Sequence, residues 1–341
     1  MKTITFEEHF VLKEVQEAMS DILQPSPDGV PLKAMLEALE SKTGFTNEDD
    51  ITQHAHRIQF MDTQNVQMQV LSYGNGSPSL VEGDKGIELC RYTNHRLKQY
   101  IDAHPDRFLG FATLPIHSPD AAAQELKYCV EELGFKGALI FGHPKGHFLD
   151  DAQFDVIFET AASLHVPIYL HPAPISDDAY QAYFKSENYP DATAASFASF
   201  GYGWHMDVGI HAIRLILSGV FDRHPQLKMI IGHWGEFTPF FYERMDDTIH
   251  APHLKHALSD YFKNHFYITP SGMLTRPQFE MVKNAVGIDH ILYSADYPYI
   301  QPQNLGTFLD ELGLNEEEKE KISYKNAEKL LNISTNIKGG F

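Results

Sequence analysis

Five side chains that can bind a metal ion or transfer a proton follow short apolar segments of this sequence. They are Glu7, His9, His171, His233 and Asp296. The segments read ITFEEH, VPIYLH, LKMIIGH and ILYSAD, and in each of them β-branched and aromatic residues lead directly to the polar residue. Polar residues that recur at the carboxyl ends of strands are typical of an active site at one face of a parallel sheet.

Segments of this kind predict the strands of a closed barrel. They are, in chain order, Ile4–His9, Val66–Tyr73, Phe108–Pro115, Phe135–His143, Val166–His171, Leu227–His233, His265–Ser271 and Ile291–Asp296. Nearly uninterrupted apolar segments are expected where a parallel sheet is buried on both faces. The intervals are long enough for helices, such as Gly86–Ala103 and Ala121–Leu133. The sequence therefore predicts an α/β fold, a (β/α)8 TIM barrel.

The chain length indicates one domain with long loops. A barrel of this type takes about 250 residues, so 341 residues leave room for insertions rather than for a second large domain. We expect a single domain over residues 1–335, with insertions at about 20–56 and 175–204 and a short tail at 336–341. Both insertions follow carboxyl ends of strands, where barrels form lids and substrate pockets.

Composition excludes several classes of partner. The net charge of −19 disfavours binding to a nucleic-acid backbone, and 43% hydrophobic residues are enough for a substantial core. No segment has the length of a membrane span, and Met1 leads to the first strand without the apolar segment of a signal peptide. We therefore expect a cytoplasmic protein without a nucleic-acid or membrane partner. Cys90 and Cys129 are expected to be buried free thiols.

Four of the polar residues form a candidate metal site. Glu7 and His9 are two positions apart in a strand, so both side chains are expected on one face, inside the barrel. His171 ends the fifth strand before Pro172, and Asp296 ends the eighth. This mixed set of nitrogen and oxygen ligands predicts one divalent ion, Zn²⁺ or Mn²⁺. The alternatives are an exposed cluster for the first pair and a structural role for the histidine beside proline.

His233 and Glu236 lie in the segment GHWGEF after the sixth strand. An acid three residues from a histidine can orient the imidazole or change its pKa, so we expect a catalytic or proton-relay pair. The alternative is a helix start at which Glu236 interacts with the helix dipole. Further histidines are expected to be structural or at the surface: His143, His147, His205 and His211. The first two follow the fourth strand, where one of them is a candidate substrate contact.

The motifs together resemble those of a known family. The pair of Glu7 and His9, together with YLHP, IGHWGE and SADYP, is similar to the amidohydrolase superfamily, a group of metal-dependent barrel enzymes. Within it the chain most resembles the metal-dependent nonoxidative decarboxylases of hydroxybenzoates, of the γ-resorcylate decarboxylase type. The resemblance extends to Tyr299 and implies that the four candidate ligands hold a single ion. It also implies catalytic roles for Asp296, His233 and Glu236.

The resemblance further implies three substrate-binding residues. Arg57 matches a contact to the substrate carboxylate, and Tyr299 matches an aromatic residue that lines the ring pocket. Arg244 matches an arginine that reaches a neighbouring subunit's site, so we expect a homodimer or homotetramer. The alternatives are a surface helix position for Arg57, and for Arg244 a salt bridge within its helix to Asp246 or Asp247.

The expected function is nonoxidative decarboxylation of a small aromatic carboxylic acid with an ortho-hydroxyl group. Asp296 would protonate the ring carbon before CO₂ leaves. A metal-dependent hydrolase of a lactone or amide, with a metal-activated water, is an alternative. Two residues count against the hydrolase. Position 7 is Glu, where hydrolytic members have histidine, and Lys136 is at the wrong end of the fourth strand to become a carboxylated ligand. A third alternative is a barrel that only binds a ligand.

Overall fold

Parallel strands form the centre of the molecule. The computed structural model describes residues 2–20, 28–31, 33–34, 37, 41, 54–74 and 76–334. Its strands are β1 (Ile4–Phe10), β2 (Met68–Tyr73), β3 (Phe108–Gly110), β4 (Ala112–Thr113), β5 (Ala138–Phe141), β6 (Ile168–His171), β7 (Met229–Ile231), β8 (Phe266–Ile268) and β9 (Tyr293–Ser294). They form two sheets, of order β3-β2-β1-β9 and β4-β5-β6-β7-β8. Every predicted strand segment overlaps at least one of these strands.

Two connections join the sheets into one ring. Phe111 alone separates β3 from β4, and its N–H donates to the carbonyl of Leu71 at 2.9 Å. On the other side, Ile268 and Ile291 form a parallel bridge, and the N–H of Leu292 donates to the carbonyl of Ile268 at 2.9 Å. β3 and β4 are thus two parts of the third strand. The strands encircle a common lumen, which confirms the predicted (β/α)8 barrel.

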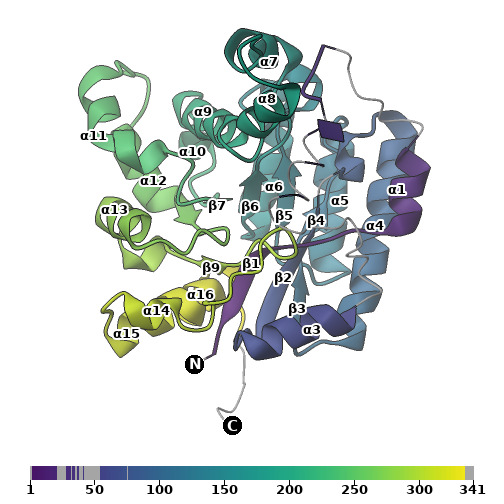
Figure 1. Cartoon of the computed structure of the whole chain (residues 1–341), viewed down its shortest axis with the longest axis vertical. Coiled ribbons are helices and arrows are strands. Elements are labelled where there is room, and N and C mark those ends of the chain that lie inside the picture. The colour runs from purple at the N-terminus through teal and green to yellow at the C-terminus, as the bar shows by residue number, and fades with distance from the viewer. Residues whose placement is uncertain are drawn as a thin grey trace.

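Helices surround the strands (Figure 1). They are α1 (Lys13–Met19), α3 (His54–Thr63), α4 (Gly83–Ala103), α5 (Pro119–Glu131), α6 (Asp155–Leu164), α7 (Asp177–Tyr183), α8 (Asp191–Ala198), α9 (Gly203–Leu217), α10 (Val220–Arg223), α11 (Thr238–Thr248), α12 (Leu258–His265), α13 (Arg276–Val286), α14 (Phe308–Glu311), α15 (Glu316–Glu320) and α16 (Asn326–Leu331). The two helices expected from the sequence correspond to α4 and α5. Pro119 occupies the first turn of α5, where its missing N–H has no helical partner to lose.

Apolar side chains fill the lumen toward the amino ends of the strands. They belong to one cluster that includes Ile4, Phe6, Met68, Val70, Phe111, Leu139, Ile230, Tyr267 and Leu292. Leu330 and Leu331 of α16 belong to the same cluster, so this helix closes the lumen at the end where the chain begins (Figure 1). Lys2 and Glu328 pair beside it, with Nζ 2.5 Å from Oε1. A larger apolar cluster fills the space between strands and helices.

A β-bulge in β1 sets the direction of the first two candidate ligands. The register between β1 and β2 shifts between Thr5 and Glu8, and Glu7 has a φ of 57°. In a regular strand Phe6 and Glu7 would lie on opposite faces. The bulge lets Phe6 stay in the lumen cluster while Glu7 and His9 face the space above it.

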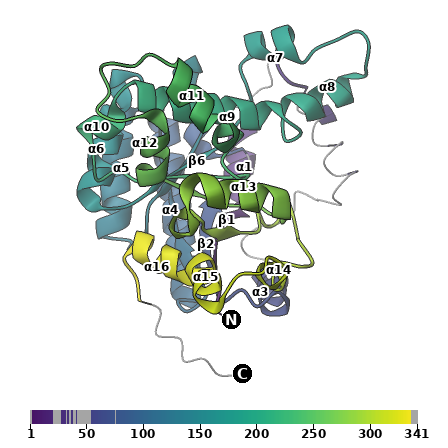
Figure 2. The ribbon, with the colours of Figure 1, turned by 90° about the vertical axis from the view of Figure 1, so that its left-hand side faces the viewer.

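The second predicted insertion forms α7 and α8, which protrude from the ring of helices (Figures 1 and 2). A small apolar cluster includes its residues Tyr180, Phe184, Ala195 and Trp204, together with Val30 of the first predicted insertion. Most of the first predicted insertion, at about 20–56, and the tail at 336–341 lie outside the described residues. Both cysteines are buried free thiols, as predicted. Among the described helices, none combines the length and the apolar composition that crossing a membrane requires.

Candidate metal centre and active site

The ends of β1, β6 and β9 bring the four candidate ligands together. Ligand atoms of Glu7, His9 and His171 all lie within 4.8 Å of one another, and all three residues are buried. Oε1 of Glu7 is 3.5 Å from Nε2 of His171. Oδ1 of Asp296 is 3.3 Å from Nε2 of His9. Three of the four residues thus form one compact group, Asp296 joins it through its contact with His9, and the role of all four as ligands stays a prediction.

Three hydroxyl groups hold one oxygen of Glu7. Tyr169 donates to Oε2 at 2.5 Å, and Thr269 donates to the same oxygen at 3.3 Å. Ser271 donates to it as well. Gly232 leaves room for this arrangement, because a Cβ there would lie 2.5 Å from Oγ of Ser271 and 3.0 Å from Oε1 of Glu7. The hydroxyls fix the carboxylate and leave Oε1, which has no hydrogen-bond partner, available as a ligand.

The two candidate histidine ligands each present one lone pair to the same centre. Nδ1 of His171 lies 2.7 Å from the carbonyl of Pro172, so Nδ1 carries the proton and Nε2 has the lone pair. Nδ1 of His9 lies 3.3 Å from Oγ of Ser72, and its buried Nε2 has no hydrogen-bond partner. Burial lowers the pKa of His171 well below its usual value and lowers that of His9 to about 3. Both rings are therefore neutral, the form that binds metals.

The donor set fits a cation. Nε2 of His171, which has the lone pair, lies 3.5 Å from Oε1 of Glu7, so acceptor faces acceptor there. Nε2 of His9 lies 3.3 Å from Oδ1 of Asp296 and makes no hydrogen bond. Burial raises the pKa of Glu7 to about 7 and raises that of Asp296 well above its usual value. These shifts reflect the cost of buried carboxylates that lack a positive partner. A divalent ion would satisfy all four residues, and the ligand types suit Zn²⁺ or Mn²⁺.

Unusual backbone angles concentrate at this end of the barrel. Ten non-glycine residues of the described chain have positive φ. Most of them lie in β1 or directly after β7, β8 and β9: Glu7, His233, Trp234, Glu236, Phe237, Ser271 and Asp296. Each such residue costs on the order of 1–3 kcal/mol, and proteins keep this strain mainly at functional sites.

His233 and Glu236 form the predicted pair after β7. Nδ1 of His233 lies 2.7 Å from Oε1 of Glu236, whose side chain is fully buried. The second oxygen, Oε2, lies 2.8 Å from Nδ1 of His205 on α9. Burial alone would raise the pKa of Glu236, but the two imidazoles lower it to about 2.

The sequence predicts a structural or surface role for His205. In the structure its side chain contacts the predicted pair through Glu236. Nothing in the sequence around it, GWHMD, differs from an ordinary helix start. Its contact with Glu236 arises only because α9 packs against the turn that follows β7. His211 on the same helix is buried and accepts a hydrogen bond from the N–H of Leu149 at 2.8 Å, the structural role expected of it.

Arg57 lies behind the end of β1. Its Nη1 donates to Oε1 of Gln69 at 3.2 Å, and its Nη2 donates to the carbonyl of His9. The guanidinium stacks on Tyr297, 4.6 Å from the ring centroid. The alternative of a surface position is wrong, because the residue is 2% exposed. These contacts support a role in holding β1 and do not show the predicted contact with a substrate carboxylate.

Tyr299 lies beside the metal centre. Its ring centroid is 5.3 Å from that of His9. Gly74 makes room for the hydroxyl, since a Cβ at this position would lie 2.5 Å from the oxygen of Tyr299. The placement is compatible with the predicted contact to an aromatic ring, which stays a prediction.

Arg244 is exposed on α11, as a residue that meets another subunit must be. Among the ion pairs between described residues, none joins it to Asp246 or Asp247, so the alternative of a helix salt bridge has no support.

Of the two histidines after β5, His147 is exposed and lies 3.0 Å from a carboxylate oxygen of Asp151. The side chain of His143 is only 8% exposed and its Nε2 lies 3.2 Å from Asp207 of α9, and its contact with a substrate stays a prediction.

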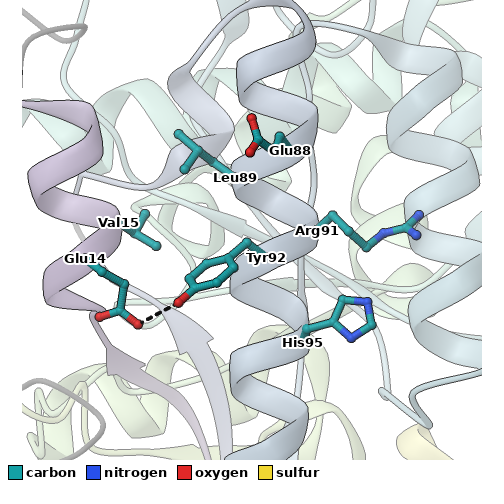
Figure 3. A pocket seen from close by; sticks show the side chains of 7 residues that line it. All are labelled: Glu14, Val15, Glu88, Leu89, Arg91, Tyr92 and His95. Carbon is teal, nitrogen blue, oxygen red and sulfur yellow. Dashed lines mark hydrogen bonds between the residues drawn. The ribbon is translucent and has the colours of Figure 1, made fainter.

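A separate cavity of about 520 Å³ lies on the flank of the barrel, between α1 and α4 (Figure 3). The hydroxyl of Tyr92 points toward Glu14 and donates to it at 3.1 Å. Arg96 also donates to Glu14 at 3.1 Å, and Arg91 donates to Glu125 at 2.6 Å. These charged groups already have partners, and no predicted site residue lines this cavity.

Comparisons with known proteins identify the family of the chain. Decarboxylase orsB from Emericella nidulans is 33% identical, and the match covers 97% of each chain. A crystal structure of a Staphylococcus aureus protein assigned to the amidohydrolases is 59% identical over 98% of this chain and 100% of that one, with a TM-score of 0.89. A dihydroxybenzoic acid decarboxylase from Polaromonas sp., with bound manganese and the inhibitor 2-nitroresorcinol, is 29% identical over 97% of each chain, with a TM-score of 0.78. Since the amidohydrolase family model also matches residues 9–333, the chain belongs to the amidohydrolase family.

Proposed function

We propose that this chain is a metal-dependent nonoxidative decarboxylase of hydroxybenzoates that carry an ortho-hydroxyl group. The observation that carries the proposal is the buried group of Glu7, His9 and His171, whose ligand atoms lie within 4.8 Å of one another, with Asp296 and Tyr299 beside His9. Relatives that match nearly the whole chain are decarboxylases of this superfamily, which confirms the expected class of activity. The substrate and the roles of single residues are the parts that we propose.

One divalent cation would be held by Glu7, His9, His171 and Asp296. Manganese is the first candidate because the Polaromonas relative binds it, and zinc suits the same ligands. When bound, the cation supplies positive charge that holds the phenolic and carboxylate oxygens of a substrate and orients its ring.

Asp296 is the proposed proton donor. Its carboxyl group protonates the ring carbon that bears the carboxylate, and the bond from this carbon to the carboxylate then breaks. The bonding electrons return to the ring, CO₂ leaves, and Asp296 regains one proton from solvent, so that the net reaction consumes one proton. Burial raises the pKa of Asp296, which favours the acid form that this step needs, although a bound cation opposes the shift.

His233 is proposed to exchange a proton with the substrate hydroxyl. Its Nδ1 is engaged by Glu236, so Nε2 on the opposite edge of the ring is the nitrogen that can act. A neutral ring with a proton on Nδ1 can accept a proton at Nε2 and return it later.

The decisive experiment measures products from a panel of acids. The manganese-loaded protein is incubated with 2,6-dihydroxybenzoate, 2-hydroxybenzoate and 4-hydroxybenzoate, and CO₂ and the phenolic product are quantified. We expect both products in equal amounts from the ortho-hydroxy acids and neither from 4-hydroxybenzoate. His147→Gln, which changes an exposed histidine, is the matched control and should behave as the wild type. Hydrolysis of lactones or amides without release of CO₂ would replace this proposal with the hydrolase alternative.

We further infer that the protein is a homodimer or homotetramer in which Arg244 meets a second copy. Phe237, Phe240 and Phe241 are 45%, 69% and 49% exposed around the start of α11, and Arg244 follows on the same helix. Exposed apolar patches of this kind are typical of interfaces. Light scattering after size-exclusion chromatography should give a multiple of the chain mass for the wild type and the single-chain mass for Phe240→Glu. A monomeric wild type would contradict this inference.

A further inference from the structure

His205 joins the pair of His233 and Glu236 from a different element, α9. Its Nδ1 lies 2.8 Å from Oε2 of Glu236, and its Nε2 lies 3.0 Å from the carbonyl of Phe200. Both partners are acceptors, so both ring nitrogens must carry protons. The geometry therefore requires an imidazolium at a side chain that is only 12% exposed.

The charge of His205 has one evident counterpart. Glu236 is fully buried and uses one oxygen for each imidazole, at 2.7 Å for His233 and 2.8 Å for His205. Because a buried carboxylate needs a positive partner, the cation at His205 keeps Glu236 ionised. The ionised carboxylate in turn requires a proton on Nδ1 of His233, which fixes the tautomer of that ring.

The two imidazoles also constrain each other directly. Their ring centroids are 4.3 Å apart, so two positive rings would repel each other strongly. The neighbouring carboxylates are Glu236, Asp296 and Glu7. Burial lowers the pKa of His205, but Glu236 and the carbonyl of Phe200 raise it by more, and the resulting pKa is about 9. The positive charge thus stays on His205, and His233 is the ring that remains neutral.

The backbone is shaped to allow this contact. Gly209 lies one turn after His205 on α9, and a Cβ there would come within 2.5 Å of the carbonyl oxygen of Glu236. α9 can therefore approach the turn after β7 only because this position lacks a side chain. Phe200 belongs to the insertion that contains α7 and α8, so His205 also links that insertion to the site.

We propose that His205 is a positioning residue of the decarboxylase: a buried cation that keeps Glu236 ionised and holds His233 neutral, with its Nδ1 proton toward Glu236 and its Nε2 free to act on the substrate. This role rests on the proposed function of His233. The charge state itself does not depend on that function, and it can be measured separately.

The first test is nitrogen NMR of the ¹⁵N-histidine-labelled protein at pH 8, loaded with diamagnetic Zn²⁺ because Mn²⁺ would broaden the signals, with assignments from His205→Gln and His233→Gln. We expect His205 to give the signals of an imidazolium and His233 those of a neutral ring protonated on Nδ1. Glu236→Gln should convert His205 to the neutral form, because its anionic partner is gone. A neutral His205 in the wild type at pH 8 would overturn the proposal, whether or not the protein proves to be a decarboxylase.

The second test is kinetic. His205→Gln should lower kcat by about 10- to 100-fold with KM within a few-fold, a range typical of residues that orient catalytic groups. Loss of the positive charge removes the repulsion that opposes a second proton on His233, so the acidic limb of the kcat profile should move to higher pH.

His211→Gln is the matched control, because it changes another buried histidine of α9 that contacts Leu149 and not Glu236. It should lower the melting temperature at most, without moving the pH profile. The proposal would be wrong if both variants changed kcat equally, or if the pH profile of kcat did not move in His205→Gln. His205 would then have only a structural role. If His205→Gln does not fold, Gly209→Ala provides the same comparison, since it moves α9 away from Glu236 and should shift the profile in the same direction.

Discussion

The two halves of the barrel lumen differ in chemistry although the same strands build both. Near the amino ends of the strands the lumen contains apolar side chains such as Phe6, Leu139 and Ile230, which pack without polar partners. Near the carboxyl ends, buried atoms of Glu7 and His9 lack hydrogen-bond partners and face a common centre. One half is complete by packing alone, whereas the other contains the residues of the proposed cation site. Stability and chemistry are therefore separated along the length of each strand.

Asp296→Asn should have the largest effect, and it acts only on the polar half. The amide has the size of the carboxyl group but cannot donate a proton to carbon, so turnover should fall by about 10²- to 10⁴-fold. CO₂ release is measured at saturating substrate, together with the melting temperature, which we expect to stay near that of the wild type. Turnover within tenfold of the wild type would remove Asp296 as the proton donor.

His171→Ala should abolish binding of the metal ion. It removes one of four candidate ligands and the lone pair that faces Glu7. Elemental analysis of the dialysed protein should find about one ion per chain in the wild type and in the control His147→Gln, and none in the variant. An unchanged metal content would exclude His171 as a ligand.

Leu139→Ala tests the apolar half. Leu139 is 4% exposed in the lumen cluster, on a strand that supplies no candidate ligand. We expect the free energy of unfolding to fall by about 2–5 kcal/mol, measured by urea denaturation. Metal content and kcat of the folded protein should stay close to the wild type. Loss of the ion from the folded variant would show that the two halves are not independent.

Gly74→Ala should have the smallest effect and tests the predicted contact of Tyr299 with the substrate ring. The new Cβ would lie 2.5 Å from the hydroxyl oxygen of Tyr299 and must displace it. Overpacking of this kind costs about 1–3 kcal/mol, so KM for the aromatic acid should rise by about tenfold. In the Gly74→Ala and Tyr299→Phe double variant the clash is gone and KM should recover. A KM that does not respond to Gly74→Ala would argue against Tyr299 as a wall of the pocket.

The positions of the strands could be predicted from the sequence because their signal is local. An apolar segment that ends in Glu, His or Asp identifies both a strand and the end at which its polar residue lies. The same reasoning failed to anticipate the bulge at Glu7, since regular alternation would separate Glu7 from Phe6. It also missed Tyr169, Thr269 and Ser271, whose hydroxyls bind Glu7 but which look like ordinary strand residues in the sequence.

Contacts between elements that are distant in the chain could not be predicted in this way. His205 contacts Glu236 only because of the way α9 packs, and the periodicity of the sequence does not predict which residues of two distant elements come into contact. Arg57 was assigned to the substrate by resemblance, whereas its guanidinium contacts Gln69 and the carbonyl of His9. Arg57 lies on α3, and a long side chain can extend from a helix in more than one direction, so the position of its Cα does not determine what its guanidinium contacts.

The closure of the lumen by α16 has a consequence for synthesis of the protein. Leu330 and Leu331 complete the apolar cluster that begins with Ile4 and Phe6, so the first strand cannot be fully covered until residue 331 has emerged from the ribosome. A nascent chain short of that point carries an open hydrophobic base, the kind of surface that chaperones bind and that promotes aggregation. Acquisition of the native barrel is therefore coupled to the synthesis of α16.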